Sequence, residues 1–189
     1  NEMVDSVYTS LGFDHVGLSD YNKINYYDSA NPSYIPAYEH GYGIFKMHQL
    51  CIGAEKVSCL DFFAFQNLSM KQHTLNRLEK QTRFAIPAHP SFVKKGYLVE
   101  DMKYLSNYKL MEVLNGFRIS TDHWDMALSN GHLVYLIGND DSHDVTDITD
   151  VATRFTMINS PENEAEPLLQ ALENGNAVGV DFPVKYDET

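Results

Sequence analysis

The chain has 189 residues, of which 43% are hydrophobic and 21% are charged, so it is long enough and apolar enough to fold around a core of its own. Its formal net charge of −12 disfavours nucleic-acid binding, because an acidic surface repels phosphate groups, although solubility alone also accounts for such a charge. No stretch approaches the ~20 consecutive apolar residues of a membrane span. We therefore expect a soluble protein without a membrane partner, while its compartment, cytoplasmic or exported, and its oligomeric state stay open.

The first part of the chain predicts a helix, a strand and a long loop. Residues 1–12 place their apolar side chains on one helical face and end in a glycine cap. Residues 13–20 are apolar-rich and predict a short strand that ends at Asp20. Residues 21–43 are rich in Tyr, Asn, Pro and Gly and have no clear period, which indicates an ordered loop that serves as a lid.

From residue 48 onward, apolar runs alternate with amphipathic segments. The pattern predicts strands at 48–57, 59–65, 84–90, 109–116, 132–143, 152–159 and 177–182, and helices at 70–81, 99–107, 122–131 and 166–175. Alternating strands and helices favour an α/β fold with a parallel sheet and right-handed crossovers. We expect one domain over residues 1–189, with its active site at the carboxyl ends of the strands.

Several polar side chains stand at or near these predicted strand ends and are expected to meet on one face of the sheet: Asp20, Glu55, His89, Asn115, Asp141 and His143. Asp141 and His143 are two residues apart, so in extended chain they point the same way, and a carboxylate beside an imidazole binds Zn²⁺, Mn²⁺ or Fe²⁺ well. The alternative is a helix-capping Asp followed by a surface His.

Other candidate ligands are open to two interpretations. Glu55 and Asp61 stand in apolar context, where a buried carboxylate needs a cation or a hydrogen-bond donor. His89, in "PAHP", is either a ligand or a packed structural histidine. For the polar side chains of "EHGYGIFKMH" (Glu39, His40 and His48), ordinary loop polarity is the favoured interpretation.

Six segments taken together and in this order, "GFDHVGLSDYNKI", "IGAEKV", "AHPSF", "MEVLNG", "IGNDDSHD" and "ATRF", resemble the PHP (polymerase and histidinol phosphatase) superfamily. The resemblance covers nearly the whole chain. It implies a distorted, TIM-like βα barrel with two or three divalent metal ions at its strand ends, and hydrolysis of phosphoesters.

The resemblance also implies roles for individual residues. Glu55 resembles the bridging glutamate of the family, and His89 resembles the histidine of its "HP" motif. Asp141 and His143 resemble the final D-x-H pair, and Asp20 resembles the aspartate of "TDH".

Glu112 and Asn115 resemble the "E-x-x-N" strand, which supports the family's site more than it ligates.

Three features depart from the family pattern. The opening H-x-H pair is absent, so the barrel is expected to be incomplete at its N-terminal strand. Tyr21 stands where the "TDH" histidine belongs, and Asp61 stands where another ligand histidine is common.

These features lead to the hypothesis of a metal-dependent phosphoesterase for a small phosphomonoester or similar anionic substrate. The expected ligands of a Zn, Mn or Fe site, complete or partial, are Glu55, Asp61, His89, Asp141 and His143. Asp141, His143 and Asp20 are the expected catalytic residues, and the expected substrate-binding residues are Tyr21, His40, Lys46, Asn115 and Arg118. The alternative is a degenerate, non-catalytic PHP-like binding domain, which Tyr21 and the missing H-x-H favour.

Overall fold

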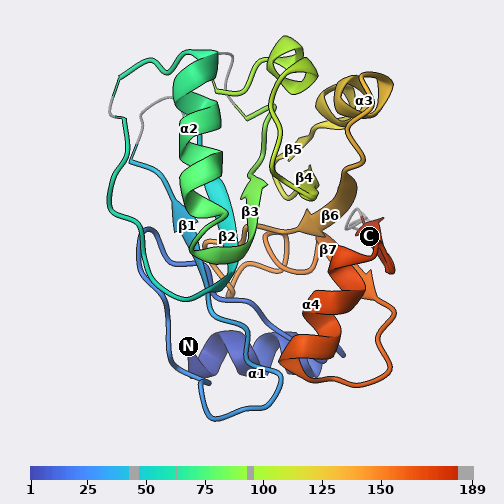
Figure 1. Cartoon of the computed structure of the whole chain (residues 1–189). Coiled ribbons are helices and arrows are strands. Elements are labelled where there is room, and N and C mark those ends of the chain that lie inside the picture. The colour runs from blue at the N-terminus through green and yellow to red at the C-terminus, as the bar shows by residue number, and fades with distance from the viewer. Residues whose placement is uncertain (43–46, 63, 93–95, 183–189) are drawn as a thin grey trace.

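The structure, a computed structural model, describes residues 1–42, 47–62, 64–92 and 96–182 (Figure 1). The α-helices are α1 (Glu2–Ser10), α2 (Leu68–Leu78), α3 (Thr121–Ser129) and α4 (Ala165–Glu173), and η1 (Val99–Lys103) is a 3-10 helix. The strands are β1 (Ala37–His40), β2 (Gln49–Ala54), β3 (Thr82–Pro87), β4 (Leu110–Asn115), β5 (Arg118–Ile119), β6 (Tyr135–Asn139), β7 (Arg154–Ile158) and β8 (Ala177–Asp181).

The strands form three small sheets. The first has the order β1-β2-β3 with antiparallel pairs, the second has the order β5-β4-β6, and β7 pairs with β8 antiparallel. Among the described strands, β4 and β6 are the one parallel pair, so the expected continuous parallel sheet is wrong. The described residues form a mixed α/β structure in which no closed barrel is seen, and the expected TIM-like barrel is therefore not confirmed.

Two predicted strands are absent. Residues 13–20 form no strand. Among the described residues, their hydrogen bonding with β1 is limited to the Asp20 carbonyl, which accepts from the Glu39 amide at 3.1 Å, beside a single parallel bridge between Tyr21 and Glu39. The described residues of 59–65 contain no strand either. Conversely, β1 lies inside residues 21–43, for which the sequence predicts only a loop. The sequence did not indicate this strand because four residues are too few to show a clear pattern.

Helix α2 packs as its sequence period predicts. Asn67 caps α2 by accepting a hydrogen bond from the Met70 amide, and Leu75 and Leu78 of this helix are fully buried in the core. Figure 1 shows α2 lying alongside the first sheet. Burial of each leucine stabilises the fold by about 1.5–3 kcal/mol.

In the first helical segment, by contrast, Met3 and Leu11 of the expected apolar face are 59% and 44% exposed, and the helix expected over residues 99–107 is only the short 3-10 helix η1. None of the described helices has both the length and the apolar character to cross a membrane.

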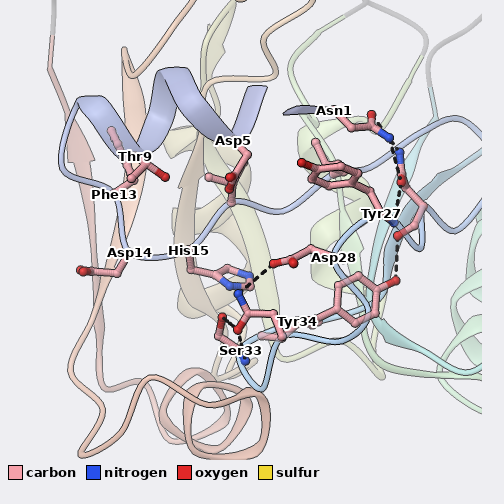
Figure 2. A pocket seen from close by; sticks show the side chains of 15 residues that line it. Asn1, Asp5, Thr9, Phe13, Asp14, His15, Tyr27, Asp28, Ser33 and Tyr34 are labelled. Atoms are coloured by element: carbon pink, nitrogen blue, oxygen red, sulfur yellow. Dashed lines mark hydrogen bonds between the residues drawn. The ribbon is translucent and has the colours of Figure 1, made fainter. Parts of the chain in front are cut away.

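The long loop before β1 is held by its own polar contacts and by α1. The Asn31 side chain donates to the Asp28 carboxylate at 2.8 Å, and the Tyr34 hydroxyl donates to the Asn25 carbonyl at 2.7 Å. Figure 2 shows Asp28 and Tyr34 among the side chains that line a small pocket between α1 and the loop. The volume of this pocket is about 60 Å³. Burial lowers the pKa of His15 in this pocket. This part of the loop is thus an ordered layer packed under α1.

Candidate metal centre

Three buried side chains from separate segments meet at one edge of the first sheet. Glu39 is in β1, His48 directly precedes β2 and His89 follows β3. Each offers one ligand atom, and these atoms lie within 4.8 Å of one another. The antiparallel register pairs His40 with Gln49, and Gln49 with Pro87. The same end of the sheet therefore holds the end of β1, the start of β2 and the end of β3.

The carboxylate of Glu39 is the centre of this cluster. Its Oε1 atom contacts His48 Nδ1 and lies 3.1 Å from His89 Nε2. Burial alone would raise the pKa of Glu39, but the hydrogen bonds from His48 and His89 outweigh burial and lower this pKa to about 2. Glu39 is therefore a carboxylate at neutral pH, the form that binds a cation.

The residues present fit a divalent cation. His89 Nδ1 is buried and has no hydrogen-bond partner among the described residues. A buried nitrogen without a partner is costly, and a cation or water beside it would remove that cost. Two imidazoles and one carboxylate are a donor set that suits Zn²⁺, Mn²⁺ and Fe²⁺.

The backbone around the cluster is strained. His89 and Asp141 have φ of 31° and 55°, in the left-handed region that costs a non-glycine residue about 1–3 kcal/mol. The His89 amide donates to Glu112 Oε2 at 2.5 Å, and its carbonyl accepts from Phe92 N at 2.8 Å. These bonds hold the His89 backbone in place.

A buried polar network on β4 and β6 lies behind the site. The Glu112 carboxylate accepts hydrogen bonds from the side chains of Asn139 at 3.0 Å and Asn115 at 3.2 Å. The Asn115 amide also lies 3.1 Å from Asp141 Oδ2. A Cβ on Gly116 would lie 1.8 Å from the Asp140 carbonyl oxygen, so only glycine lets the end of β4 come this close to the chain after β6. This approach brings Asn115 to Asp141.

A pocket of about 170 Å³ opens beside the cluster and shares His89 with it. Its walls are formed by Tyr21, His89, Phe92, Phe117, Asp141 and His143. The carbonyl of Asp141 lies 2.7 Å from His143 Nδ1, so Nε2 is the nitrogen that remains for a ligand. Asp141 and His143 therefore line a pocket that shares His89 with the Glu39 cluster.

Tyr21 lies between the pocket and the cluster. Its ring meets the His48 ring edge-on, with centroids 5.3 Å apart. Burial, followed by the charges of Glu39 and Asp141, raises the pKa of Tyr21 to about 12. The phenol is thus a neutral hydrogen-bond donor at physiological pH.

The structure does not bring Glu55 to this site. Glu55 is exposed and lies beyond the far end of β2, where its amide donates to the Gln81 carbonyl at 3.0 Å. The expectation that Glu55 meets His89 is wrong because β2 runs antiparallel to β3, so the end of β2 lies opposite to the end of β3. Glu39 and His48, interpreted from sequence as loop polarity, are the side chains found beside His89.

Two further candidates lie on the other face of β1. His40 is fully buried, with Nδ1 2.8 Å from Gln49 Oε1 and Nε2 3.2 Å from the Leu60 carbonyl. It follows Glu39 directly, and adjacent strand residues point to opposite faces. The carboxylate of Asp61 accepts hydrogen bonds from the Tyr42 and Phe62 amides, each at 2.7 Å. Neither side chain belongs to the Glu39 cluster or lines the pocket.

The remaining candidates are peripheral or outside the described residues. Asp20 is exposed and accepts a hydrogen bond from the Asn25 side chain at 3.1 Å. Arg118 is exposed on β5 and does not line the described pocket. Lys46 lies outside the described residues.

Among comparisons with known proteins, the comparison with solved structures gives a match. No protein-family model matches the sequence, and no curated protein matches it. The fold is similar to the crystal structure of a two-domain protein from Bacteroides vulgatus that contains a predicted PHP-like metal-dependent phosphoesterase, with a TM-score of 0.58 and 17% sequence identity. The match covers 78% of this chain and 44% of that protein, so this chain spans less than half of its length. The similarity supports a related fold.

Proposed function

We propose that this chain is a metal-dependent phosphoesterase that hydrolyses a small phosphomonoester. The observation that carries the proposal is the convergence of Glu39, His48 and His89 within 4.8 Å, beside a pocket that Asp141 and His143 also line. The solved protein with a similar fold contains a predicted PHP-like metal-dependent phosphoesterase, which supports the same class of activity here.

Glu39, His48 and His89 would hold a Zn, Mn or Fe ion, and Asp141 with His143 would supply ligands on the pocket side. When bound, such an ion polarises a phosphoryl oxygen and lowers the pKa of water towards neutrality. Glu55 and Asp61 are not part of the proposed ligand set, because each lies away from the cluster.

The side chains of this protein would position the substrate and move protons. Asn115 orients the Asp141 carboxylate through its bond of 3.1 Å, while Glu112 holds the His89 backbone. The neutral Tyr21 hydroxyl would donate to a substrate oxygen in the pocket.

The test combines metal analysis with hydrolysis of 4-nitrophenyl phosphate in the presence of Mn²⁺ or Zn²⁺. We expect His89→Ala and the double variant Asp141→Ala/His143→Ala to lose at least about a hundredfold in kcat/KM, since ligand loss costs more than loss of a supporting residue. Glu55→Gln is the matched control, and it should retain both activity and metal.

The alternative, a non-catalytic PHP-like domain, is favoured by Tyr21, because a tyrosine is a much poorer Zn²⁺ or Mn²⁺ ligand than a histidine. Stoichiometric metal binding without hydrolysis of any phosphomonoester would support this alternative. A fully active Asp141→Ala/His143→Ala protein would rule out the proposed phosphoesterase site.

A further inference from the structure

The pocket beside the metal cluster is walled by an unbroken series of aromatic rings. Each neighbouring pair has its ring centroids between 5.1 and 6.1 Å apart. The series runs from Tyr21 through His48, His89, Phe92 and Phe117 to His143. These are tilted or edge-to-face contacts, the geometry that aromatic pairs prefer.

The outer members of the series retain a large accessible surface. Tyr21 is 49% exposed and Phe117 is 45% exposed, although both line the pocket. Phe117 lies in the tight turn between β4 and β5, where its amide donates to Asn115 Oδ1 at 3.0 Å. The backbone that carries this exposed ring is therefore anchored to the network behind the site. Exposed aromatic rings on an anchored backbone beside a pocket are typical of a ligand-binding surface.

The charges of the pocket disfavour a leaving group that carries a further negative charge. Among the described residues that line it there is no Lys or Arg, and Asp141 is an acidic group. An additional anionic group on the substrate would therefore meet no counter-charge from these walls and would be repelled by Asp141.

We infer that the leaving group of the substrate carries a single planar aromatic ring, which stacks against Phe117 and Tyr21 at the rim while the phosphate enters the pocket. This inference rests on the proposed phosphoesterase function and specifies its substrate class. The pocket, at about 170 Å³, is smaller than the ~300–1,000 Å³ of sites for drug-sized ligands, so it suits a phosphate with one ring above it.

The test compares two substrates that differ only in the planarity of the ring. Benzyl phosphate and cyclohexylmethyl phosphate have leaving alcohols of similar basicity and size. With the Mn²⁺-loaded protein we expect kcat/KM to be about threefold to tenfold higher for benzyl phosphate, mainly through KM, because stacking contributes equally to the bound ground state and the transition state.

Variants separate stacking from other causes. Phe117→Leu should remove the preference, and Phe117→Tyr should keep it, because tyrosine retains the ring. Tyr104→Leu alters an aromatic side chain that is 65% exposed and does not line the pocket, and it should leave the ratio of the two kcat/KM values unchanged. Equal kcat/KM values for the two substrates, or a preference that survives in Phe117→Leu, would overturn the inference.

A binding measurement distinguishes failure of this inference from failure of the proposed function. Calorimetric titration with benzylphosphonate and cyclohexylmethylphosphonate reports affinity without hydrolysis. Tighter binding of benzylphosphonate that is lost in Phe117→Leu, in a protein that hydrolyses neither ester, would keep the aromatic subsite and reject the phosphoesterase. Hydrolysis of both esters at equal rates would keep the phosphoesterase and reject the subsite. If neither ester is hydrolysed and neither phosphonate binds, both are wrong.

Discussion

The hydroxyl of Tyr8 in α1 donates a hydrogen bond of 2.5 Å to Oδ2 of Asp140, the residue that directly precedes Asp141. The same carboxylate oxygen accepts the Ala152 amide at 2.8 Å. The first helix, the residue that follows β6 and the end of the segment before β7 are thus joined through one partly buried carboxylate, which is adjacent to Asp141 of the pocket.

Replacing Tyr8 by phenylalanine removes the donor and keeps the ring. We expect Tyr8→Phe to lower the free energy of unfolding by about 1–3 kcal/mol, because Asp140 then loses a partner in a largely buried position. Urea denaturation measures this change. Tyr26→Phe is the control, because Tyr26 is 63% exposed. Equal unfolding midpoints for the two variants would show that the Tyr8 bond does not stabilise the fold.

Asp150 organises the loop that carries His143. Its Oδ2 accepts the amides of His143 at 2.6 Å and Asp144 at 2.9 Å, and the Ser142 hydroxyl at 3.2 Å. In Asp150→Ala we expect the His143 and Asp144 amides to exchange with deuterium about tenfold faster, since each loses a charge-assisted bond. Asp125→Ala on the exposed face of α3 is the control. Unchanged exchange in Asp150→Ala would show that other contacts hold the loop.

Metal binding should stabilise the folded protein. If the buried cluster binds a cation and the unfolded chain does not, Mn²⁺ or Zn²⁺ at about a hundredfold its Kd adds about 2.7 kcal/mol to the free energy of unfolding. The measurement is the shift in Tm on adding metal to chelator-treated protein. We expect the shift to disappear in His48→Ala and to persist in His73→Ala, because His73 is an exposed residue of α2. A shift of the same size in both variants would place the bound metal elsewhere.

The buried His123 predicts an acid sensitivity that is independent of the metal centre. Its Nε2 lies 3.0 Å from the Tyr97 carbonyl, and its Nδ1 is buried without a described partner. Burial lowers the pKa of His123 below its usual value, despite the opposing effects of the Tyr97 carbonyl and nearby acidic groups, so the folded state favours the neutral ring.

Because the pKa of His123 is lower in the folded state, the stability that it contributes is present above its ordinary pKa of about 6.5 and is lost as the pH falls below that value. In His123→Gln we expect a flatter dependence of the unfolding free energy on pH below about 6.5, measured by urea titrations across this range. An exposed histidine gives the control, His73→Gln, which should keep the wild-type slope. A wild-type slope in His123→Gln would assign the acid sensitivity to other groups.

The positions of three site residues, His89, Asp141 and His143, follow from the local sequence pattern. Asp141 and His143 come after an apolar run that predicts β6, and His89 comes after a run that predicts β3. Side chains at the ends of neighbouring strands tend to gather at one edge. For β4 and β6, which are parallel, this expectation holds, and Asn115 lies beside Asp141.

The identity of the glutamate in the cluster was decided only by tertiary structure. Glu39 lies near the end of β1, and Glu55 directly follows β2. The alternation of side chains along a strand does not indicate whether its neighbours run parallel or antiparallel to it, because the period of two is the same in both cases. The antiparallel pairing of β2 with both neighbours sends Glu55 to the far end and brings Glu39 and His48 to His89.

The sequence by itself determined most helical segments, the apolar runs and the presence of polar side chains at several strand ends, since these depend on local periodicity. It did not distinguish the short 3-10 helix η1 from the α-helix expected over residues 99–107. The tertiary structure alone decided which strands are antiparallel and which face of β1 holds Glu39 rather than His40. The physical reason is that strand pairing and register depend on contacts between residues far apart in the chain, and a one-residue difference in strand position reverses the face on which a side chain lies.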